Sequence, residues 1–197
     1  VFRMQDNAKR LAQGAKRMMM RPVPENMFQK AVIDLVKANL DYLPPLNKGA
    51  LYIRPLLFGS GEGLGVQPSF ENTFCIYVCP VGNYFKGLNC IDIMVTKDFH
   101  RAPQKGVGSI KAAGNYAASL LPGKTAKNKG YAEILYLDHD GVHVEEVGAA
   151  NLSMINEDTL TIAESDSILP GITRDSVATI AKEKLNLKVK FDKIPIE

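Results

Sequence analysis

One lysine, Lys111, stands in a segment of small residues that suits covalent chemistry at an amine. Gly106, Gly108 and Gly114 flank it, and Tyr116 follows five positions later. A reactive amine must be reachable by a bulky planar partner, and small neighbours leave that room. Because an amine condenses with an aldehyde, Lys111 is a candidate for a Schiff base. A lone lysine in a loop is, by type alone, more often exposed surface.

Two later features supply chemistry that complements such an amine. Glu146 could keep a pyridine nitrogen protonated, so that the ring accepts electrons. The amides of Ile172 and Thr173 follow Gly171 at the start of a helix, where geometry and dipole favour a phosphate. Each feature also has a plain interpretation, because a glutamate closing a hairpin strand is usually exposed and Pro-Gly often only precedes a helix.

Arg10 and Tyr116 complete the set. The Arg10 guanidinium could add a bidentate phosphate contact, and the Tyr116 phenol could hydrogen-bond a ring oxygen. An amine, an acid, phosphate donors and a phenol are together what pyridoxal 5'-phosphate requires. We therefore predict that Lys111 carries this cofactor, and we expect no metal site.

Length and composition indicate an ordinary globular protein. The 197 residues are 46% hydrophobic and 23% charged, with a net charge of +3, which is not typical of a disordered chain. Acidic and basic residues are interspersed, which argues against a nucleic-acid partner. A basic run, Lys9-Arg10 and Lys16-Arg17 through Arg21, suits either a small anion or a solvated helix face.

The cysteines and the hydropathy pattern bear on the compartment. Cys75, Cys79 and Cys90 lie in apolar, strand-like runs, and their odd number favours reduced core thiols over a disulfide or a metal site. There is no apolar run of about 18 residues and no signal-peptide pattern, so no membrane partner is expected. A cytoplasmic location is the simplest expectation; an organellar one stays open because the chain begins without methionine.

The first half of the chain predicts helices followed by strands. Asp6 or Asn7 would cap a helix from about Ala8 to Met20, after a strand end at residues 1–3. A second helix is expected over about 25–40. A strand over 50–58 places Tyr52 and Arg54 on one face, with Pro55 favouring an edge or a bulge; further strands are expected over 73–80 and 90–95.

Two connections in this half lack regular structure. Glycines at 59, 61, 63 and 65 lack the Gly-Lys-Ser/Thr of a phosphate loop, so a mobile or close-contact loop is favoured. Residues 96–108 contain charges, a proline and glycines, which suits a connection between lobes.

The second half predicts a different alternation. Helix is expected over 116–121, strand over 132–138, a hairpin turn at Asp140-Gly141, and a second hairpin around 156–158. Thr173 would cap a helix over about 174–185, with Val177, Ile180 and Ala181 buried. Strands and helices alternate without a βαβ repeat, which favours an α+β or mixed α/β fold.

Three segments resemble the signatures of the branched-chain aminotransferases, a family of fold-type IV pyridoxal-phosphate enzymes. They are Lys111-Ala112-Ala113-Gly114-Asn115-Tyr116, Glu146-Val147-Gly148-Ala149-Ala150-Asn151 and Leu169-Pro170-Gly171-Ile172-Thr173-Arg174. Four earlier segments are similar in the same order: residues 1–11, Tyr52-Ile53-Arg54-Pro55, Gly63-Leu64-Gly65-Val66 and Pro80-Val81-Gly82-Asn83-Tyr84.

The resemblance implies a role for each cofactor-binding residue. Lys111 links covalently to pyridoxal phosphate and moves a proton between substrate and cofactor, while Glu146 pairs with the ring nitrogen. Tyr116 contacts the ring oxygen. The phosphate is held by Arg10 together with Ile172 and Thr173.

It also implies a substrate site and a homodimer. Tyr52 and Arg54 let one site accept both a branched side chain and glutamate, and Arg54 meets the distal carboxylate. Ala149 and Ala150 face the substrate carboxylate, Tyr84 lines the side-chain pocket, and Val66 reaches into the neighbouring subunit. The reaction moves the amino group of leucine, isoleucine or valine to 2-oxoglutarate, which gives glutamate and a branched-chain 2-oxo acid.

By the same resemblance the fold has two lobes. Residues 1–95 correspond to a small lobe lacking its start, 96–108 to the connection, and 109–197 to the first part of a large cofactor-binding lobe lacking its end. We therefore expect a chain truncated at both ends. Two alternatives stay open: a related fold-type IV enzyme, such as D-amino-acid aminotransferase or aminodeoxychorismate lyase, and an inactive fragment that keeps the fold.

Overall fold

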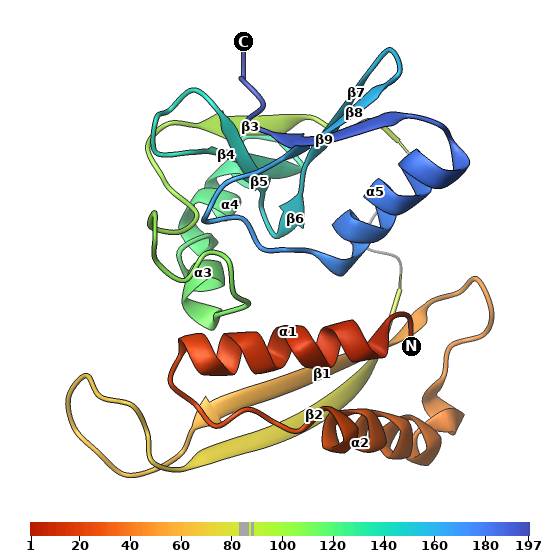
Figure 1. The fold of residues 1–197 in the computed structure, drawn as a ribbon, viewed down its shortest axis with the longest axis vertical. Coiled ribbons are helices and arrows are strands. Elements are labelled where there is room, and N and C mark those ends of the chain that lie inside the picture. The colour runs from red at the N-terminus through yellow and green to blue at the C-terminus, as the bar shows by residue number, and fades with distance from the viewer. Residues whose placement is uncertain (83–86, 88) are drawn as a thin grey trace. The chain divides into compact units, whose positions relative to one another are not determined.

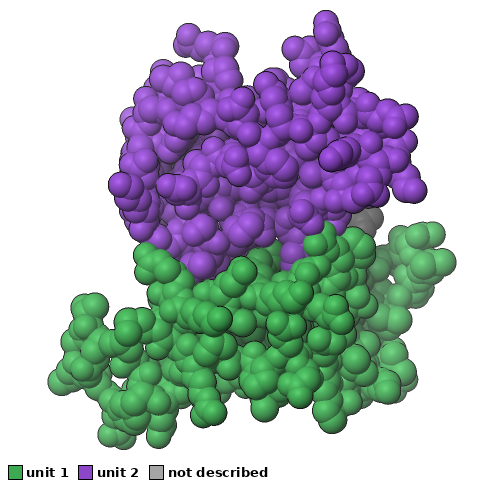
Figure 2. Space-filling view, in the orientation of Figure 1, with its two compact units in different colours: residues 1–89 green, residues 90–197 purple. Residues whose placement is uncertain are grey.

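The computed structural model covers residues 1–197 and describes all of them except 83–86 and 88. Tyr84, expected at the substrate site, lies outside the described residues. Contacts divide the chain into two compact units, Val1–Asn89 and Cys90–Glu197 (Figure 2). The boundaries expected at 95 and 109 concern the lobes of the family's full-length chains and stay predictions.

Unit 1 consists of helices on one face of a two-stranded sheet (Figure 1). Its elements are α1 (Met4–Arg17), α2 (Glu25–Ala38), the 3-10 helix η1 (Leu40–Tyr42), β1 (Ala50–Gly59) and β2 (Asn72–Val81). β1 and β2 pair antiparallel in unbroken register, with Pro55 opposite Ile76. Each strand has one partner within unit 1, and an edge strand tolerates the missing N–H of Pro55.

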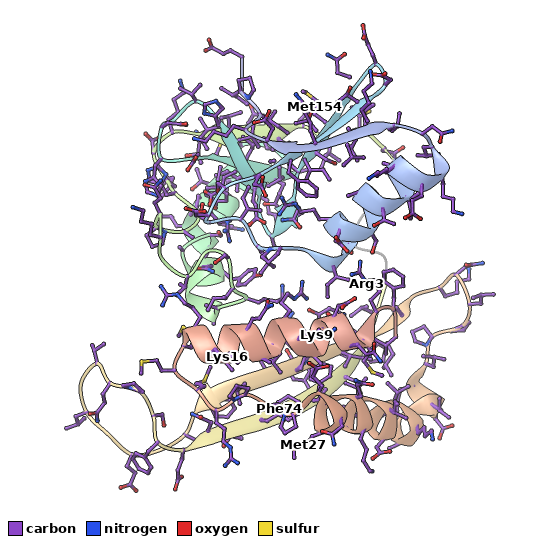
Figure 3. The ribbon with its side chains drawn as sticks, in the orientation of Figure 1. Arg3, Lys9, Lys16, Met27, Phe74 and Met154 are labelled. Carbon is purple, nitrogen blue, oxygen red and sulfur yellow. The ribbon has the colours of Figure 1, made fainter. Side chains whose placement is uncertain are left out.

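Strand alternation separates a core face from an exposed face. Apolar side chains of one face pack against both helices, with the rings of Phe28 and Phe74 6.1 Å apart (Figure 3 labels Phe74). Tyr52, Arg54, Cys75, Tyr77 and Cys79 alternate with that set and are exposed. The thiols are free, but they are not core residues. The core placement expected for the cysteines was wrong, because on β2 they share the phase of the outward side chains.

Helix α1 begins earlier than the sequence predicted. No strand forms over residues 1–3, and Arg3 occupies the N-cap position with φ +48°. Its guanidinium pairs with Asp6 at 2.7 Å, and Asn7 donates to the Arg3 carbonyl at 3.0 Å. Asp6 and Asn7 therefore lie inside the helix and do not cap it. Arg10 lies beyond the first turn of the helix, which begins at Met4.

Unit 2 contains two small mixed sheets. The first has strand order β3-β4-β5-β6 and the second β7-β8-β9. β3 and β4 run parallel, as do β8 and β9, and the other pairs are antiparallel. The strands are β3 (Ile93–Thr96), β4 (Glu133–Leu137), β5 (Val144–Val147), β6 (Ala150–Asn151), β7 (Ser153–Asn156), β8 (Thr159–Ala163) and β9 (Lys188–Asp192).

Helices connect the parallel strands of both sheets. α3 (Ala113–Ala117) and α4 (Leu120–Asn128) lie between β3 and β4 in the chain, and α5 (Ile172–Lys184) lies between β8 and β9. Ala126 of α4 packs against Ile134 and Tyr136 of β4. Ala181 of α5 packs on β8, whereas Val177 and Ile180 are exposed, so only part of the predicted buried stripe is buried. None of the helices in the described residues is long and apolar enough to cross a membrane.

Candidate active site

Lys111 is exposed at the end of the glycine-containing loop, and its amine is paired with a phenol. Its Nζ donates to Tyr116 Oη at 2.9 Å and lies 5.0 Å from the centre of that ring. The buried Asn115 between them donates to the carbonyls of Val107 and Ile110, at 2.8 and 3.1 Å. These bonds fasten the loop to α3, which fixes the lysine and tyrosine relative to each other.

The glycines around Lys111 serve packing more than access. A Cβ on Gly108 would overlap the carbonyl oxygen of Ser167, and one on Gly106 would come within 3.0 Å of Pro103. Gly114 has nothing within 4 Å of that position. The expectation that small residues leave room is therefore met at Gly114 alone of these three, since the other two permit close backbone packing.

Glu146 is brought to its position by an irregularity in β5. Leu135 of β4 faces Val147, and Leu137 faces Val144. Two residues of β5, Glu145 and Glu146, thus stand opposite the single residue Tyr136, which is a β-bulge. In a regular strand adjacent side chains point to opposite faces, whereas here one arginine approaches both carboxylates.

That arginine is Arg101, which is 4% exposed. Its Nε lies 2.7 Å from Glu146 Oε2, and its Nη2 lies 3.6 Å from Glu145 Oε1. Both glutamates are also buried, at 2% and 3% exposure. The other oxygen of Glu146 accepts a 2.5 Å hydrogen bond from Asn151, which faces it across the β5–β6 pair. The carboxylate is thus held at both oxygens.

Burial and the neighbouring charges together set the pKa values of the two carboxylates. Burial raises the pKa of Glu146 to about 7, against a lowering contribution from Arg101 and a raising one from Glu145. Burial likewise raises the pKa of Glu145. A carboxylate with a pKa near neutrality exchanges a proton readily in the physiological range, which is the usual behaviour of groups at functional sites.

The start of α5 is tied to the same carboxylate through Asn151. The helix begins at Ile172 with Gly171 as its N-cap, and no side chain caps it. Thr173 is the second helical residue, so its predicted capping role was wrong. Asn151 also donates to the Leu169 carbonyl at 2.9 Å, and a Cβ on Gly171 would overlap its Oδ1. Glycine at 171 therefore allows the helix to begin against Asn151.

The remaining predicted residues of unit 2, Ala149 and Ala150, lie at a tight turn. Gly148, which has φ +54°, and Ala149 form the turn between β5 and β6, Ala150 is the first residue of β6, and both alanines are exposed. The turn has only two residues because Val147 pairs directly with Ala150. This geometry presents backbone amides and methyl groups at the surface of unit 2.

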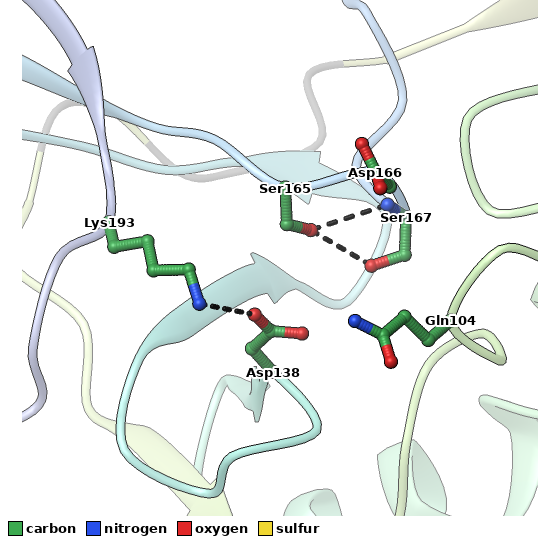
Figure 4. A pocket seen from close by; sticks show the side chains of 6 residues that line it. All are labelled: Gln104, Asp138, Ser165, Asp166, Ser167 and Lys193. Carbon is green, nitrogen blue, oxygen red and sulfur yellow. Dashed lines mark hydrogen bonds and ion pairs between the residues drawn. The ribbon is translucent and has the colours of Figure 1, made fainter.

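A polar hollow of about 180 Å³ lies in unit 2 (Figure 4). Gln104, Asp138, Ser165, Asp166, Ser167 and Lys193 line it. Lys193 pairs with Asp138 at 3.5 Å, and the Ser165 and Ser167 hydroxyls are 2.9 Å apart. Four of the six lining side chains are thus paired within the hollow.

The predicted residues of unit 1 are described within that unit. Arg54 Nη2 donates to Tyr52 Oη at 2.7 Å and its guanidinium lies 5.0 Å from the ring centre, so the two side chains share a face as expected. Val66 is fully exposed on the glycine-rich loop, beside Gly65 with φ +91°. Arg10 Nη2 donates to Asn7 Oδ1 at 3.2 Å.

Sequence reasoning missed Arg101, Glu145 and Asn151. Arg101 lies in the segment 96–108, which the sequence predicts as a connection between lobes and not as part of the site. Asn151 ends the segment that starts with Glu146, but two-residue turn geometry was needed to see that they face each other. The available signal in the sequence was a charged residue, Arg101, within a short segment that contains proline and glycines.

Unit 2 thus contains an exposed amine held by a phenol and a buried carboxylate held by an arginine and an amide. The model of the family Amino-transferase class IV matches residues 1–197. The chain belongs to the class IV aminotransferase family.

Relatives and solved structures agree with this family. The chain is 45% identical over 185 residues to a chloroplastic branched-chain-amino-acid aminotransferase of Arabidopsis thaliana, covering 92% of this chain and 45% of the relative. Identity to the Helicobacter pylori branched-chain-amino-acid aminotransferase is 44% over 204 residues, covering 100% of this chain and 59% of that protein. The chain therefore spans about half the length of these curated relatives.

Two crystal structures show the same fold. The Escherichia coli branched-chain amino acid aminotransferase superposes with a TM-score of 0.86 at 32% identity, covering 100% of this chain and 64% of that one. The enzyme from Thermobaculum terrenum in its PLP form gives 0.84 at 28% identity, covering 98% and 62%. The predicted mixed α/β, fold-type IV class and the family resemblance are confirmed.

Proposed function

We propose that this chain is part of a branched-chain amino acid aminotransferase that binds pyridoxal 5'-phosphate. The observation that carries the proposal is the 44% identity to an enzyme of that name over the whole chain. The reaction transfers the amino group of leucine, isoleucine or valine to 2-oxoglutarate. Its products are glutamate and a branched-chain 2-oxo acid.

The residues of unit 2 fit the cofactor chemically. When bound, pyridoxal phosphate supplies an aldehyde for an amine and a ring that accepts electrons from the substrate. Lys111 is an exposed primary amine, and Glu146 is a buried carboxylate near a surplus of negative charge, which suits a protonated ring nitrogen. The α5 N-terminus without a side-chain cap suits a phosphate at Ile172 and Thr173.

Each of the proposed cofactor-binding residues then has a defined role. Lys111 holds the cofactor and, once released, takes and returns the substrate proton as a base. Tyr116, within 2.9 Å of the lysine nitrogen, orients that amine and contacts the ring oxygen. Glu146 keeps the ring nitrogen protonated. Arg10 contributes to the phosphate site in the assembled protein.

The substrate-binding roles are proposed residue by residue. Arg54, supported by Tyr52, binds the distal carboxylate of glutamate and 2-oxoglutarate, because a guanidinium matches a carboxylate in shape and charge. The Ala149–Ala150 turn meets the α-carboxylate. Tyr84 is assigned to the side-chain pocket by its place in the sequence.

Absorbance spectroscopy tests the cofactor assignment directly. The purified protein with pyridoxal phosphate is expected to show a visible Schiff-base band that Lys111→Ala abolishes, while Lys105→Ala, a nearby lysine in the same loop, keeps it. A wild-type protein without the band at saturating cofactor would indicate an inactive fragment. A band that persists in Lys111→Ala would exclude Lys111 as the attachment site.

Coupled assays separate the substrate classes. The full-length parent protein is expected to turn over leucine with 2-oxoglutarate and to leave D-alanine unchanged. Turnover of D-alanine alone would overturn the branched-chain assignment in favour of a related fold-type IV enzyme. The chain of 197 residues assayed beside its parent would show how much activity these two units retain.

A homodimer is part of the proposal. It is supported by Val66, an apolar side chain held fully exposed on the loop between β1 and β2, where a second subunit would cover it. Sedimentation of the parent protein is expected to give a dimer, and a monomer at all concentrations would contradict this. A cytoplasmic location also stays a proposal, since the relatives include chloroplastic and mitochondrial forms.

A further inference from the structure

Unit 2 buries three charged side chains together, with one more acid than base. Arg101, Glu145 and Glu146 are each no more than 4% exposed. The guanidinium lies 2.7 Å from Glu146 and 3.6 Å from Glu145. Removing charges from water is costly unless they are paired, so two buried carboxylates with one guanidinium are an unusual and expensive arrangement. A functional role would account for this cost.

The same guanidinium connects three segments of the candidate site. Arg101 Nη2 donates to the carbonyl of Gly108, three residues before Lys111, at 3.2 Å. It also donates to the carbonyl of Ser167, five residues before the start of α5. Its Nε makes no hydrogen bond and contacts Glu146 as an ion pair. Arg101 therefore fastens the lysine loop and the approach to α5 around the carboxylate.

We propose that Arg101 is a positioning residue that keeps Glu146 ionised and fixed in the cofactor site, and that Glu145 is the acid that competes for it. This inference rests on the role proposed above for Glu146. Arg101 touches neither substrate nor cofactor in this scheme. It acts through the carboxylate, which must carry a charge to keep a ring nitrogen protonated.

The surrounding charges support this division of roles. Burial is the largest influence on Glu146 and raises its pKa to about 7, Arg101 lowers it, and Glu145 raises it. Arg174 of α5 is a second, weaker cation acting on Glu146. Asp138 raises the pKa of Glu145, and His139 lowers it. Arg101 is thus the principal opponent of the burial that would neutralise Glu146.

The bulge in β5 is what makes the competition possible. A regular strand would turn Glu145 and Glu146 to opposite faces, and a single guanidinium would then reach one of them. With both ionised, the cluster carries a net charge of −1. A protonated ring nitrogen would bring it to zero, as uptake of one proton by a glutamate would in the cofactor-free protein.

Two substitutions at the cluster are expected to have opposite effects. The probe is the pH midpoint of the Glu146 side-chain carbon, followed by NMR in the cofactor-free protein with labelled glutamate. Arg101→Gln is expected to raise the midpoint, by about one to three pH units for loss of an adjacent opposite charge. Glu145→Gln is expected to lower it. A general loosening of the site would move both in the same direction.

A lysine variant keeps the test decisive if Arg101→Gln does not fold. Arg101→Lys retains the charge but loses the planar guanidinium that donates to the two carbonyls. Its pH midpoint is therefore expected to lie between those of wild type and Arg101→Gln. If Arg101→Gln does not fold, the midpoint of Arg101→Lys is expected slightly above that of wild type. An unchanged midpoint in every folded Arg101 variant, or shifts of one sign in Arg101 and Glu145 variants, would overturn the proposal.

A second readout separates this inference from the proposed function. With ring-labelled pyridoxal phosphate bound, the nitrogen signal of wild type is expected to report a protonated ring at neutral pH, and that of Arg101→Gln a deprotonated one. Wild type that binds no cofactor would refute the proposed function, while the Glu146 titration still stands on its own. A ring that stays protonated in a folded, cofactor-bound Arg101→Gln would refute the role of Arg101 alone.

Discussion

Arg54 and Arg101 each pair with a neighbouring side chain, but in opposite surroundings. Arg54 lies on the outward face of β1, where it donates to the exposed Tyr52 at 2.7 Å. Arg101 is buried against Glu145 and Glu146 and also bonds two backbone carbonyls. Water screens and competes with the first pair, so it contributes little to stability. Water cannot screen or compete with the buried contacts of Arg101 in the same way.

The difference shows where structure and function are joined in this chain. The exposed pair can change with small effect on folding, which is compatible with the substrate-binding role proposed for it. The buried cluster couples protonation to folding, because any change in its charge is felt as free energy. We expect substitutions to follow this division, and three of them test it in decreasing order of effect.

The largest expected effect is on the pH dependence of stability. The pKa of Glu146 rises from 4.5 to about 7 on folding, so between these values the folded state holds more protons than the unfolded state. Its contribution is therefore fully present below about pH 4.5 and is lost as pH rises through about 7. This difference corresponds to about 3 kcal/mol. Glu146→Gln is expected to remove that decline.

Urea unfolding between pH 4.5 and pH 7.5 measures this decline in the cofactor-free protein. Glu183→Gln, on the exposed side of α5, controls for the loss of one carboxylate. If Glu146→Gln and wild type lose the same free energy across this range, Glu146 does not titrate in the folded protein as its burial requires. The contrast with the exposed pair would then have to be abandoned.

A smaller effect is expected where backbones meet beside the cluster. A methyl group on Gly108 would overlap the Ser167 carbonyl oxygen, which is also an acceptor for Arg101. Gly108→Ala should therefore destabilise the protein by about 1–3 kcal/mol, because backbone must move to make room. Gly123→Ala, in α4 with nothing within 4 Å, should stabilise it by about 0.5–1 kcal/mol.

Thermal or urea unfolding of the two glycine variants gives this comparison. Opposite signs would show that the packing of the lysine loop against Ser167 is specific. Equal and small changes in the free energy of unfolding of both variants would show that the backbone of residues 106–108 moves at little cost. The cluster would then be less rigid than its contacts indicate.

Sequence reasoning reached the parts of the site that periodicity or local motifs encode. Alternation along β1 placed Tyr52 and Arg54 on one face, since a continuous ladder keeps its phase from end to end. The motif resemblance identified Lys111, Glu146 and the start of α5. It assigned them roles toward the cofactor, but it did not show which side chains of the protein hold them in place.

The buried cluster could not be read in the same way. Glu145 and Glu146 act together because of a one-residue bulge, which changes the phase of the strand and leaves no sequence signature. Arg101 joins them across 44 residues of chain, from a segment whose composition predicts a connection between lobes. The prediction for the start of α1 failed for a related reason: Arg3 and Asp6 pair across the first turn, and that pair outweighs the capping preference of Asp6 or Asn7.

The smallest expected effect is at the exposed pair, and it is the sharpest check on the comparison. Tyr52→Phe removes the acceptor of the 2.7 Å bond from Arg54 but keeps the ring beneath the guanidinium. Since both side chains are exposed, the free energy of unfolding should change by no more than about 0.5 kcal/mol. In the parent enzyme, KM for 2-oxoglutarate should rise more than KM for leucine, because Arg54 loses the hydroxyl that orients it toward a distal carboxylate. A loss of stability as large as that of Gly108→Ala would mean that the outward face of β1 is covered in the folded protein, and the contrast between an adaptable exposed arginine and a fixed buried one would no longer hold.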